Sequence, residues 1–151
     1  MKIYLLTHER ELQRKTNTGQ LALDVLGPMV ERVTWARREP SPVLLDLINA
    51  HPPALMYPEA GAQYSALEQF DDIVLIDSTW QEANKIYNRS AYLHALPKVT
   101  IENTSPSIYR LRRNQPEGGL CTAECIVELL RLKGLFSEAD ALLQAFGTFN
   151  Q

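Results

Sequence analysis

The chain has 151 residues, of which 45% are hydrophobic and 22% are charged, with a formal net charge of −3. These proportions are typical of a globular protein and exclude collagen-like, coiled-coil and disordered chains. The longest apolar run near the start, residues 3–6, is too short for a signal-peptide core or a membrane span, so we expect a cytoplasmic protein. Cys121 and Cys125 form no Cys-x-x-Cys pair and the three histidines lack ligand spacing, so no metal site is predicted.

Strand and helix patterns alternate along the chain. Residues 8–15 are expected to form a helical turn or an ordered loop, 16–19 a turn, and 21–26 a short apolar segment. Apolar or β-branched runs predict strands at residues 2–7, 31–37, 54–57, 73–76 and 97–102. Capping residues and apolar stripes predict helices at residues 42–49, 80–87, 120–133 and 137–146, the last opened by Ser137.

This alternation predicts an α/β domain with a mainly parallel sheet and helices on both faces. Ligands of such sheets bind at the carboxyl ends of the strands, so chemistry is expected in the loops at 7–19, 58–63, 77–80 and 102–122. The sequence contains no P-loop, no dinucleotide fingerprint, no His-Glu-x-x-His and no Gly-x-Ser-x-Gly. Several common enzyme classes are therefore excluded.

Ten of the fifteen cationic residues are arginine, and most of them cluster at residues 10–15, 32–38 and 110–113. Each cluster alone is best explained by a solvated face with local ion pairs. The planar fork of arginine also matches phosphate and carboxylate, so three clusters together favour an anionic partner more than the net charge does.

Polar residues follow the strongest predicted strand. Asp77 can accept a proton, orient a nucleophile or bind a ribose hydroxyl, but Asp and Thr before a helix are also ordinary capping residues. Thr122 and Glu124, at the start of the long predicted helix, leave the same choice. The residues alone therefore predict an α/β domain that binds an anionic or nucleotide-like ligand.

The run Leu-Ile-Asp-Ser-Thr-Trp-Gln-Glu-Ala-Asn-Lys at 75–85 resembles the defining motif of the DTW-domain family, Asp-x-Thr-Trp followed by an Ala and a Lys. Further family blocks follow in the same order: Arg-x-x-Asn-Thr-Gly-x-Leu at 14–21, an apolar strand end with Pro at 55–59, Leu-Pro at 96–97, Tyr-x-x-Arg at 109–112 and a Ser-Thr-x-Glu-Ala-like block at 120–124. The similarity covers about residues 8–130. We expect one DTW domain at 1–151 that lacks the N-terminal cysteine cluster of larger relatives and carries Cys125 in place of an Ala.

The resemblance implies a tRNA-uridine aminocarboxypropyltransferase. Such an enzyme moves the 3-amino-3-carboxypropyl group of S-adenosylmethionine to N3 of a tRNA uridine and releases methylthioadenosine. The implied fold is SPOUT-like, with a C-terminal trefoil knot. Two alternatives remain: a SAM-dependent RNA methyltransferase, and a non-catalytic RNA- or nucleotide-binding module.

The resemblance also assigns expected roles. Asp77 acts as the base or orients the N3 proton, Thr79 hydrogen-bonds the cofactor or the base, and Arg14 or Arg112 clamps the methionine carboxylate. Cofactor contacts are expected from Asn17, Gly19, Pro58, Ser78, Trp80, Leu96, Pro97, Arg112, Leu120, Thr122 and Glu124. RNA phosphates are expected to contact Arg10, Arg14, Arg37, Arg38, Arg110 and Arg113.

Overall fold

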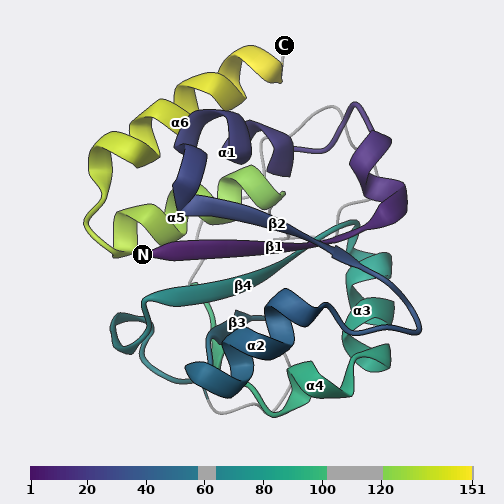
Figure 1. Ribbon diagram of the computed structural model, residues 1–151. Coiled ribbons are helices and arrows are strands. Elements are labelled where there is room, and N and C mark those ends of the chain that lie inside the picture. Colours follow the sequence, from purple (N-terminus) through teal and green to yellow (C-terminus); the bar gives the residue numbers. More distant parts are fainter. Residues whose placement is uncertain (58–63, 102–120, 151) are drawn as a thin grey trace.

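The computed structural model describes residues 1–57, 64–101 and 121–150 (Figure 1). Its strands form a five-stranded sheet in the order β2-β1-β4-β3-β5, and every neighbouring pair is parallel. The strands are β1 (Lys2–His8), β2 (Val30–Trp35), β3 (Ala54–Met56), β4 (Asp72–Asp77) and β5 (Lys98–Val99). The parallel sheet expected from the sequence is confirmed.

Helices connect the strands. The α-helices are α1 (Gly19–Leu26), α2 (Pro42–Ala50), α3 (Trp80–Arg89), α4 (Ala91–His94), α5 (Thr122–Leu132) and α6 (Phe136–Phe149). Short 3-10 helices are η1 (Glu9–Gln13), η2 (Gly27–Met29) and η3 (Leu67–Gln69). Figure 1 shows α1, α5 and α6 together in the upper half of the view, and α2, α3 and α4 in the lower half.

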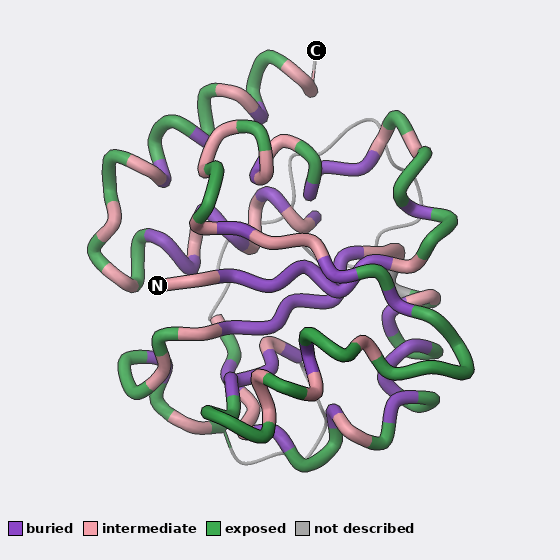
Figure 2. Tube along the Cα trace, viewed as in Figure 1, coloured by how far each residue is buried: buried purple, intermediate pink, exposed green. Residues whose placement is uncertain are grey.

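Two hydrophobic cores form because alternate residues of a strand face opposite sides of the sheet. One side of the central strands packs on α1, α5 and α6 through Ile3, Leu5, Ile73 and Leu75. The other side packs on α2, α3 and α4 through Tyr4, Leu6, Val74 and Ile76. Figure 2 shows these central strands as the buried middle of the molecule. Helices therefore cover both faces, as expected.

Local capping explains where several helices begin and end. Ser41 Oγ accepts a hydrogen bond from the Leu44 amide at 3.5 Å, and Pro42 occupies the first turn of α2. Thr79 Oγ1 accepts from the Glu82 amide at 3.2 Å, which starts α3 directly after β4. Gly134 has φ +76° just after α5, a conformation that favours glycine. The helices predicted at residues 42–49, 80–87 and 120–133 are thus present.

Some predicted boundaries are wrong. Helix α6 begins at Phe136, and Leu135, not Ser137, is its N-cap. The reason is a tight turn, in which the Leu135 amide donates to the Leu130 carbonyl while its own carbonyl accepts from the Ala139 amide. The apolar segment at 21–26 is part of helix α1, and α4 was not predicted. Strand β2 ends at Trp35, before the predicted boundary.

All five strands point the same way, so their carboxyl ends lie at one edge of the sheet, where β1 leads into η1 and β4 into α3 (Figure 1). Residues 102–120, which link β5 to α5, lie outside the described residues, and the trefoil knot stays a prediction. No helix in the described part of the chain is long and apolar enough to cross a membrane.

Candidate functional site

Asp77, the last residue of β4, is the centre of a buried polar cluster at the carboxyl edge of the sheet. It shares the strand face of Ile73 and Leu75, so its carboxylate points toward α1 and α5, and it is only 1% exposed. Thr7 is its partner in the register of β1, and Thr7 Oγ1 donates to Asp77 Oδ2 at 3.3 Å. A charged group this deep is tolerated only when it is hydrogen-bonded and paired.

Asn17 supplies two of the hydrogen bonds to this carboxylate. Its Nδ2 lies 3.1 Å from Asp77 Oδ1 and 3.0 Å from Asp77 Oδ2. Its Oδ1 accepts from the Gln20 amide at 2.9 Å and from Arg32 Nη2 at 2.8 Å. Because the oxygen faces two donors and the nitrogen faces a carboxylate, the orientation of the amide is determined. The same oxygen also caps the first turn of α1.

Gly19 begins α1 against the Asp77 carboxylate. A Cβ atom at this position would lie 2.3 Å from Asp77 Oδ2 and 2.8 Å from its carboxyl carbon. Glycine is therefore required by close approach, and the start of α1 lies against the anion, where the helix dipole favours negative charge.

Helix α5 begins at the same carboxylate. Thr122 Oγ1 donates to Asp77 Oδ1 at 2.7 Å, and the Ala123 amide donates to Thr18 Oγ1 at 3.0 Å. Glu124 Oε1 accepts from the Cys121 amide at 3.1 Å, so the Glu124 carboxylate caps α5, the helix to which it belongs. The first turns of α1 and α5, about 100 residues apart in sequence, thus meet at one buried carboxylate.

Arg32 carries the positive charge of the cluster and was not predicted as a site residue. Its Nη2 lies 3.5 Å from Asp77 Oδ2, its Nη1 donates to Gln20 Oε1 at 2.9 Å, and its side chain is 16% exposed. One signal was available, because Arg32 lies two residues after the buried Val30 and therefore shares its face of β2.

Arg14 is engaged by two carboxylates. Its Nη1 donates to Glu11 Oε2 at 2.8 Å, and its Nη2 donates to Glu82 Oε1 at 2.9 Å. Glu11 is fully buried, and its Oε1 accepts from Asn17 Nδ2 at 3.4 Å. The two ion pairs join η1 to α3, and each engages one terminal nitrogen of the guanidinium. The predicted substrate role of Arg14 stays a prediction.

Three buried polar atoms near this edge have no hydrogen-bond partner within residues 1–57, 64–101 and 121–150: Arg32 Nε, Ser78 Oγ and Glu82 Oε2. Two are donors suited to a carboxylate, and the third is an acceptor suited to an ammonium group. An amino-acid moiety carries both of these groups, so the residues present fit the methionine part of S-adenosylmethionine. Thr79 beside them uses its oxygen for the helix cap, as one interpretation of the sequence anticipated.

The remaining predicted site residues are more dispersed. Leu96 is buried in the core with α2, α3 and α4, and the Pro97 carbonyl accepts from the Leu55 amide at 2.8 Å. Arg10 is exposed in η1, which follows β1, and Arg37 and Arg38 are exposed in the loop that follows β2. Pro58, Arg110, Arg112, Arg113, Leu120 and the side chain of Trp80 lie outside the described residues.

The two cysteines are held as neutral thiols. Burial, with a smaller contribution from the Glu124 charge, raises the pKa of Cys125 to about 12 and raises the pKa of Cys121 as well. Thiols with raised pKa values are poor nucleophiles and poor metal ligands at neutral pH. Over the ranges that the structure describes, no three His, Cys, Asp or Glu side chains are grouped to hold a metal ion.

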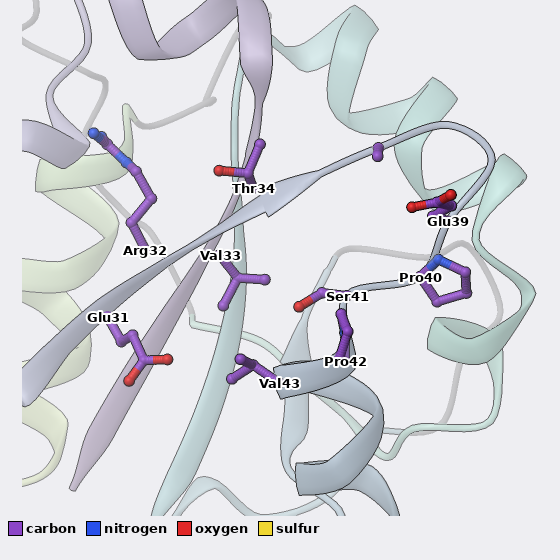
Figure 3. A pocket seen from close by; sticks show the side chains of 10 residues that line it. Glu31, Arg32, Val33, Thr34, Glu39, Pro40, Ser41, Pro42 and Val43 are labelled. Atoms are coloured by element: carbon purple, nitrogen blue, oxygen red, sulfur yellow. The ribbon is translucent and has the colours of Figure 1, made fainter.

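A separate pocket of about 390 Å³ lies between β2 and the start of α2 (Figure 3). Val33, Ser41 and Val43 line it, and Arg32 contributes to its wall. In Figure 3 the Arg32 side chain leads away from Val43, and its guanidinium belongs to the Asp77 cluster. The pocket and the cluster are therefore distinct features on either side of β2.

A model of the DTW domain matches residues 1–151. The chain belongs to the DTW domain family. It is 30% identical over 139 residues to "tRNA-uridine aminocarboxypropyltransferase 2" of Drosophila melanogaster, an alignment covering 85% of this chain and 55% of that protein. The protein of the same name from Macaca fascicularis is 25% identical over 141 residues, with coverage of 86% and 47%. The chain thus spans about half the length of these curated relatives.

A solved structure is similar to this DTW domain in fold. The SAM-dependent rRNA:acp-transferase Tsr3 from Vulcanisaeta distributa superposes with a TM-score of 0.58 at 15% sequence identity, over 98% of this chain and 76% of that one. The SPOUT-like arrangement expected from the family resemblance is confirmed. The three DTW-family segments at 14–21, 75–85 and 120–124 converge through Asn17, Asp77 and Thr122.

Proposed function

We propose that this DTW domain transfers the 3-amino-3-carboxypropyl group of S-adenosylmethionine to N3 of a uridine in tRNA and releases methylthioadenosine. One observation carries the proposal: the three family segments meet at the Asp77 carboxylate, at the edge of the sheet where α/β domains bind ligands. The names of the Drosophila and Macaca relatives support tRNA uridine as the acceptor. The name of the Tsr3 structure supports S-adenosylmethionine as the donor.

The proposed reaction requires mainly that the protein position the reacting carbon of the cofactor and N3 of the uridine. S-adenosylmethionine, when bound, supplies a carbon already activated by its sulfonium leaving group. The protein must hold that carbon in line with N3, and such positioning is worth roughly 7–11 kcal/mol. Ser78 Oγ, which has no partner among the described residues, is proposed to hold the methionine carboxylate, and Glu82 Oε2, equally without one there, to hold the amine. Holding these two groups favours attack at the aminocarboxypropyl carbon over attack at the methyl.

Asp77 orients the site in this proposal and does not take the N3 proton. A carboxylate has about four lone-pair positions. Asp77 already accepts from Thr7, Arg32 and Thr122, and twice from Asn17. Both of its oxygens are thus engaged, and with 1% exposure the carboxylate is shielded from a uridine approaching from solvent. Its contacts instead fix Thr122 and Asn17, whose own side chains lie at the edge of the sheet.

The exposed arginines are proposed to bind RNA. Arg10 in η1 and Arg37 and Arg38 in the loop after β2 lie on the same edge as the Asp77 cluster. Arginines at this edge would guide an RNA backbone toward the site through phosphate contacts. Arg110 and Arg113 would add to this surface.

The proposal is tested with purified protein, S-adenosylmethionine and tRNA lacking the modification. Mass spectrometry should detect methylthioadenosine together with aminocarboxypropyluridine in the digested RNA. S-adenosylhomocysteine in place of methylthioadenosine would identify a methyltransferase. Binding of RNA and S-adenosylmethionine with neither product would identify a binding module, and both results would refute the proposal.

The Asp77→Asn variant tests the role of the central carboxylate. It should bind S-adenosylmethionine but lose most of the transfer. The amide nitrogen of the new side chain would face the hydroxyl and amide groups that now donate to Asp77, and two donors cannot form a hydrogen bond. Asp72→Asn, at the opposite end of β4, is the matched control and should transfer at the rate of the unaltered protein. If Asp77→Asn fails to bind S-adenosylmethionine, Asp77 belongs to the binding surface and the orienting role is wrong.

A further inference from the structure

Arg32 is the one cationic side chain that contacts Asp77 within the ranges 1–57, 64–101 and 121–150. The other groups bonded to this carboxylate are the neutral Asn17 amide and the hydroxyls of Thr7 and Thr122. Neutral donors satisfy lone pairs, but they do not balance the charge of a carboxylate that is 1% exposed. Among the described side chains, the charge balance of the cluster therefore depends on Arg32.

The position of Arg32 in the sheet explains how it reaches Asp77 from an edge strand. Arg32 pairs with Leu5 of β1, and Leu5 pairs with Leu75 of β4. The next inward-facing pair along β1 and β4 is Thr7 with Asp77. Arg32 is therefore level with Leu75, two residues before Asp77 along the strand direction. An arginine side chain is long enough to cross β1 and reach the carboxylate.

Arg32 also determines how Asn17 is oriented. Nη2 donates to Asn17 Oδ1 at 2.8 Å, the shortest hydrogen bond that this amide makes to the described residues. The bond holds the oxygen away from Asp77 and directs Nδ2 toward the carboxylate. Nη1 donates to Gln20 Oε1 on α1, so the fork of the guanidinium spans two acceptors.

We propose that Arg32 is a positioning residue for the transfer reaction: it fixes Asp77 and Asn17, and through them the first turns of α1 and α5. Its effect on the reaction rests on the proposed function, but its hold on Asp77 does not. A displacement of about 1 Å at a reacting centre can lower a rate by about 100-fold. Loss of Arg32 should therefore lower kcat more than it raises KM.

The test is a double-mutant cycle of Arg32→Gln, Asp77→Asn and the variant that carries both changes. Arg32→Lys and Arg131→Gln are measured beside it. Arg131 is exposed on α5 and pairs with Glu128 at 3.0 Å, so its variant controls for the loss of an ion-paired arginine at a remote surface. Steady-state kinetics of methylthioadenosine release gives kcat and the KM for S-adenosylmethionine, and urea unfolding gives stability.

Arg32→Gln should lower kcat by about 100-fold with KM changed by less than about threefold, and Arg131→Gln should leave both unchanged. Arg32→Lys should recover about tenfold of the loss, because it restores the charge without the fork. The double variant should be no slower and no less stable than the worse single variant, since both changes break one contact.

Three results would overturn the proposal: wild-type kcat in Arg32→Gln, Arg32→Lys no faster than Arg32→Gln, or losses that add in the double variant. If the unaltered protein releases no methylthioadenosine, the proposed function fails separately. Urea unfolding of the unaltered protein, the two single variants and the double variant then tests the contact between Arg32 and Asp77. Support for this contact would be a loss of stability in the double variant that is smaller than the sum of the two single losses. Losses that add would refute it.

Discussion

At the scale of single residues, the Asp77 cluster shows how a buried charge is stabilised. Breaking a buried ion pair typically costs about 3–5 kcal/mol, because the remaining charge is left without compensation. Asp77 has Arg32 as its counter-ion at 3.5 Å, and both α1 and α5 present their amino-terminal turns to it. Such a cluster is rigid, which suits a reaction in which placement is the main requirement.

Only part of this cluster could be predicted from the sequence. Asp77 and Thr122 follow from their places at a strand end and a helix start, both of which are local patterns. Arg32 and Thr7 depend on which strands are neighbours, since each reaches Asp77 across the sheet. The fully buried Glu11 lies in a run of charged residues for which the sequence predicts a helical turn or an ordered loop, with nothing to mark this glutamate as buried. Contacts between residues distant in sequence leave no local signal.

The cysteines give a prediction about pH. An unfolded thiol loses its proton near pH 8.5, whereas burial holds the pKa of Cys125 at about 12 in the folded chain. Between these values the unfolded state binds fewer protons, so the free energy of unfolding should fall as pH rises, by up to about 1.4 kcal/mol per pH unit for this thiol. Below pH 8 the effect should be absent.

Urea unfolding from pH 7 to 10 checks this, with Cys125→Ala as the control. The unaltered protein should lose more stability above pH 8.5 than the control does, because other titrating groups are common to both. Equal slopes would show that the Cys125 thiol ionises as freely in the folded chain as in the unfolded one.

At the scale of elements, the two helix starts at Asp77 differ in how they are built. Helix α5 meets the carboxylate through the Thr122 hydroxyl, a side chain that reaches it at 2.7 Å. Helix α1 meets it through Gly19, where the lack of a side chain makes room. The Asn-Thr-Gly segment therefore has a physical explanation: Asn17 bonds the carboxylate, Thr18 caps α5 and Gly19 leaves space.

The prediction at this scale compares two glycines in helices. Gly19→Ala should destabilise the protein by about 1–3 kcal/mol, because its Cβ would overlap Asp77 Oδ2 at 2.3 Å. Gly147→Ala in α6 should stabilise it by up to about 1 kcal/mol, because the added Cβ would have free space beyond its own helix backbone and alanine favours helix. Urea midpoints measure both, and a stable Gly19→Ala would mean that the carboxylate is free to move aside.

The elements themselves were more predictable than their boundaries. Strands at residues 2–7 and 73–76 carry apolar runs that only a buried parallel strand explains, and both are present. Helix α1 was missed because its first turn is capped by Asn17, whose side chain also serves Asp77, so the start signal reads as a turn. The short strand β5 ends at Val99, where no further pairing with β3 is made.

At the scale of the whole molecule, the net charge of −3 conceals an uneven distribution. Exposed arginines follow β1 and β2, whereas two other arginines are neutralised by carboxylates: Arg14 by Glu11 and Glu82, and Arg32 by Asp77. Arg37 and Arg38 are exposed and adjacent at the carboxyl edge. The expected RNA surface is therefore a local feature that the total charge does not reveal.

Salt dependence of tRNA binding tests this surface. Each phosphate contact contributes about 0.7–0.9 to the slope of log affinity against log salt concentration. Replacing Arg37 and Arg38 together by Gln should reduce that slope by about 1–2 and weaken binding equally for tRNAs of different sequence, because phosphates carry no sequence information. Replacing Arg89 and Arg131, which are exposed on α3 and α5, removes the same charge elsewhere and should change the slope by less than about half as much. Equal slopes for the two double variants would place the RNA on another face, since long-range charge alone would then account for binding.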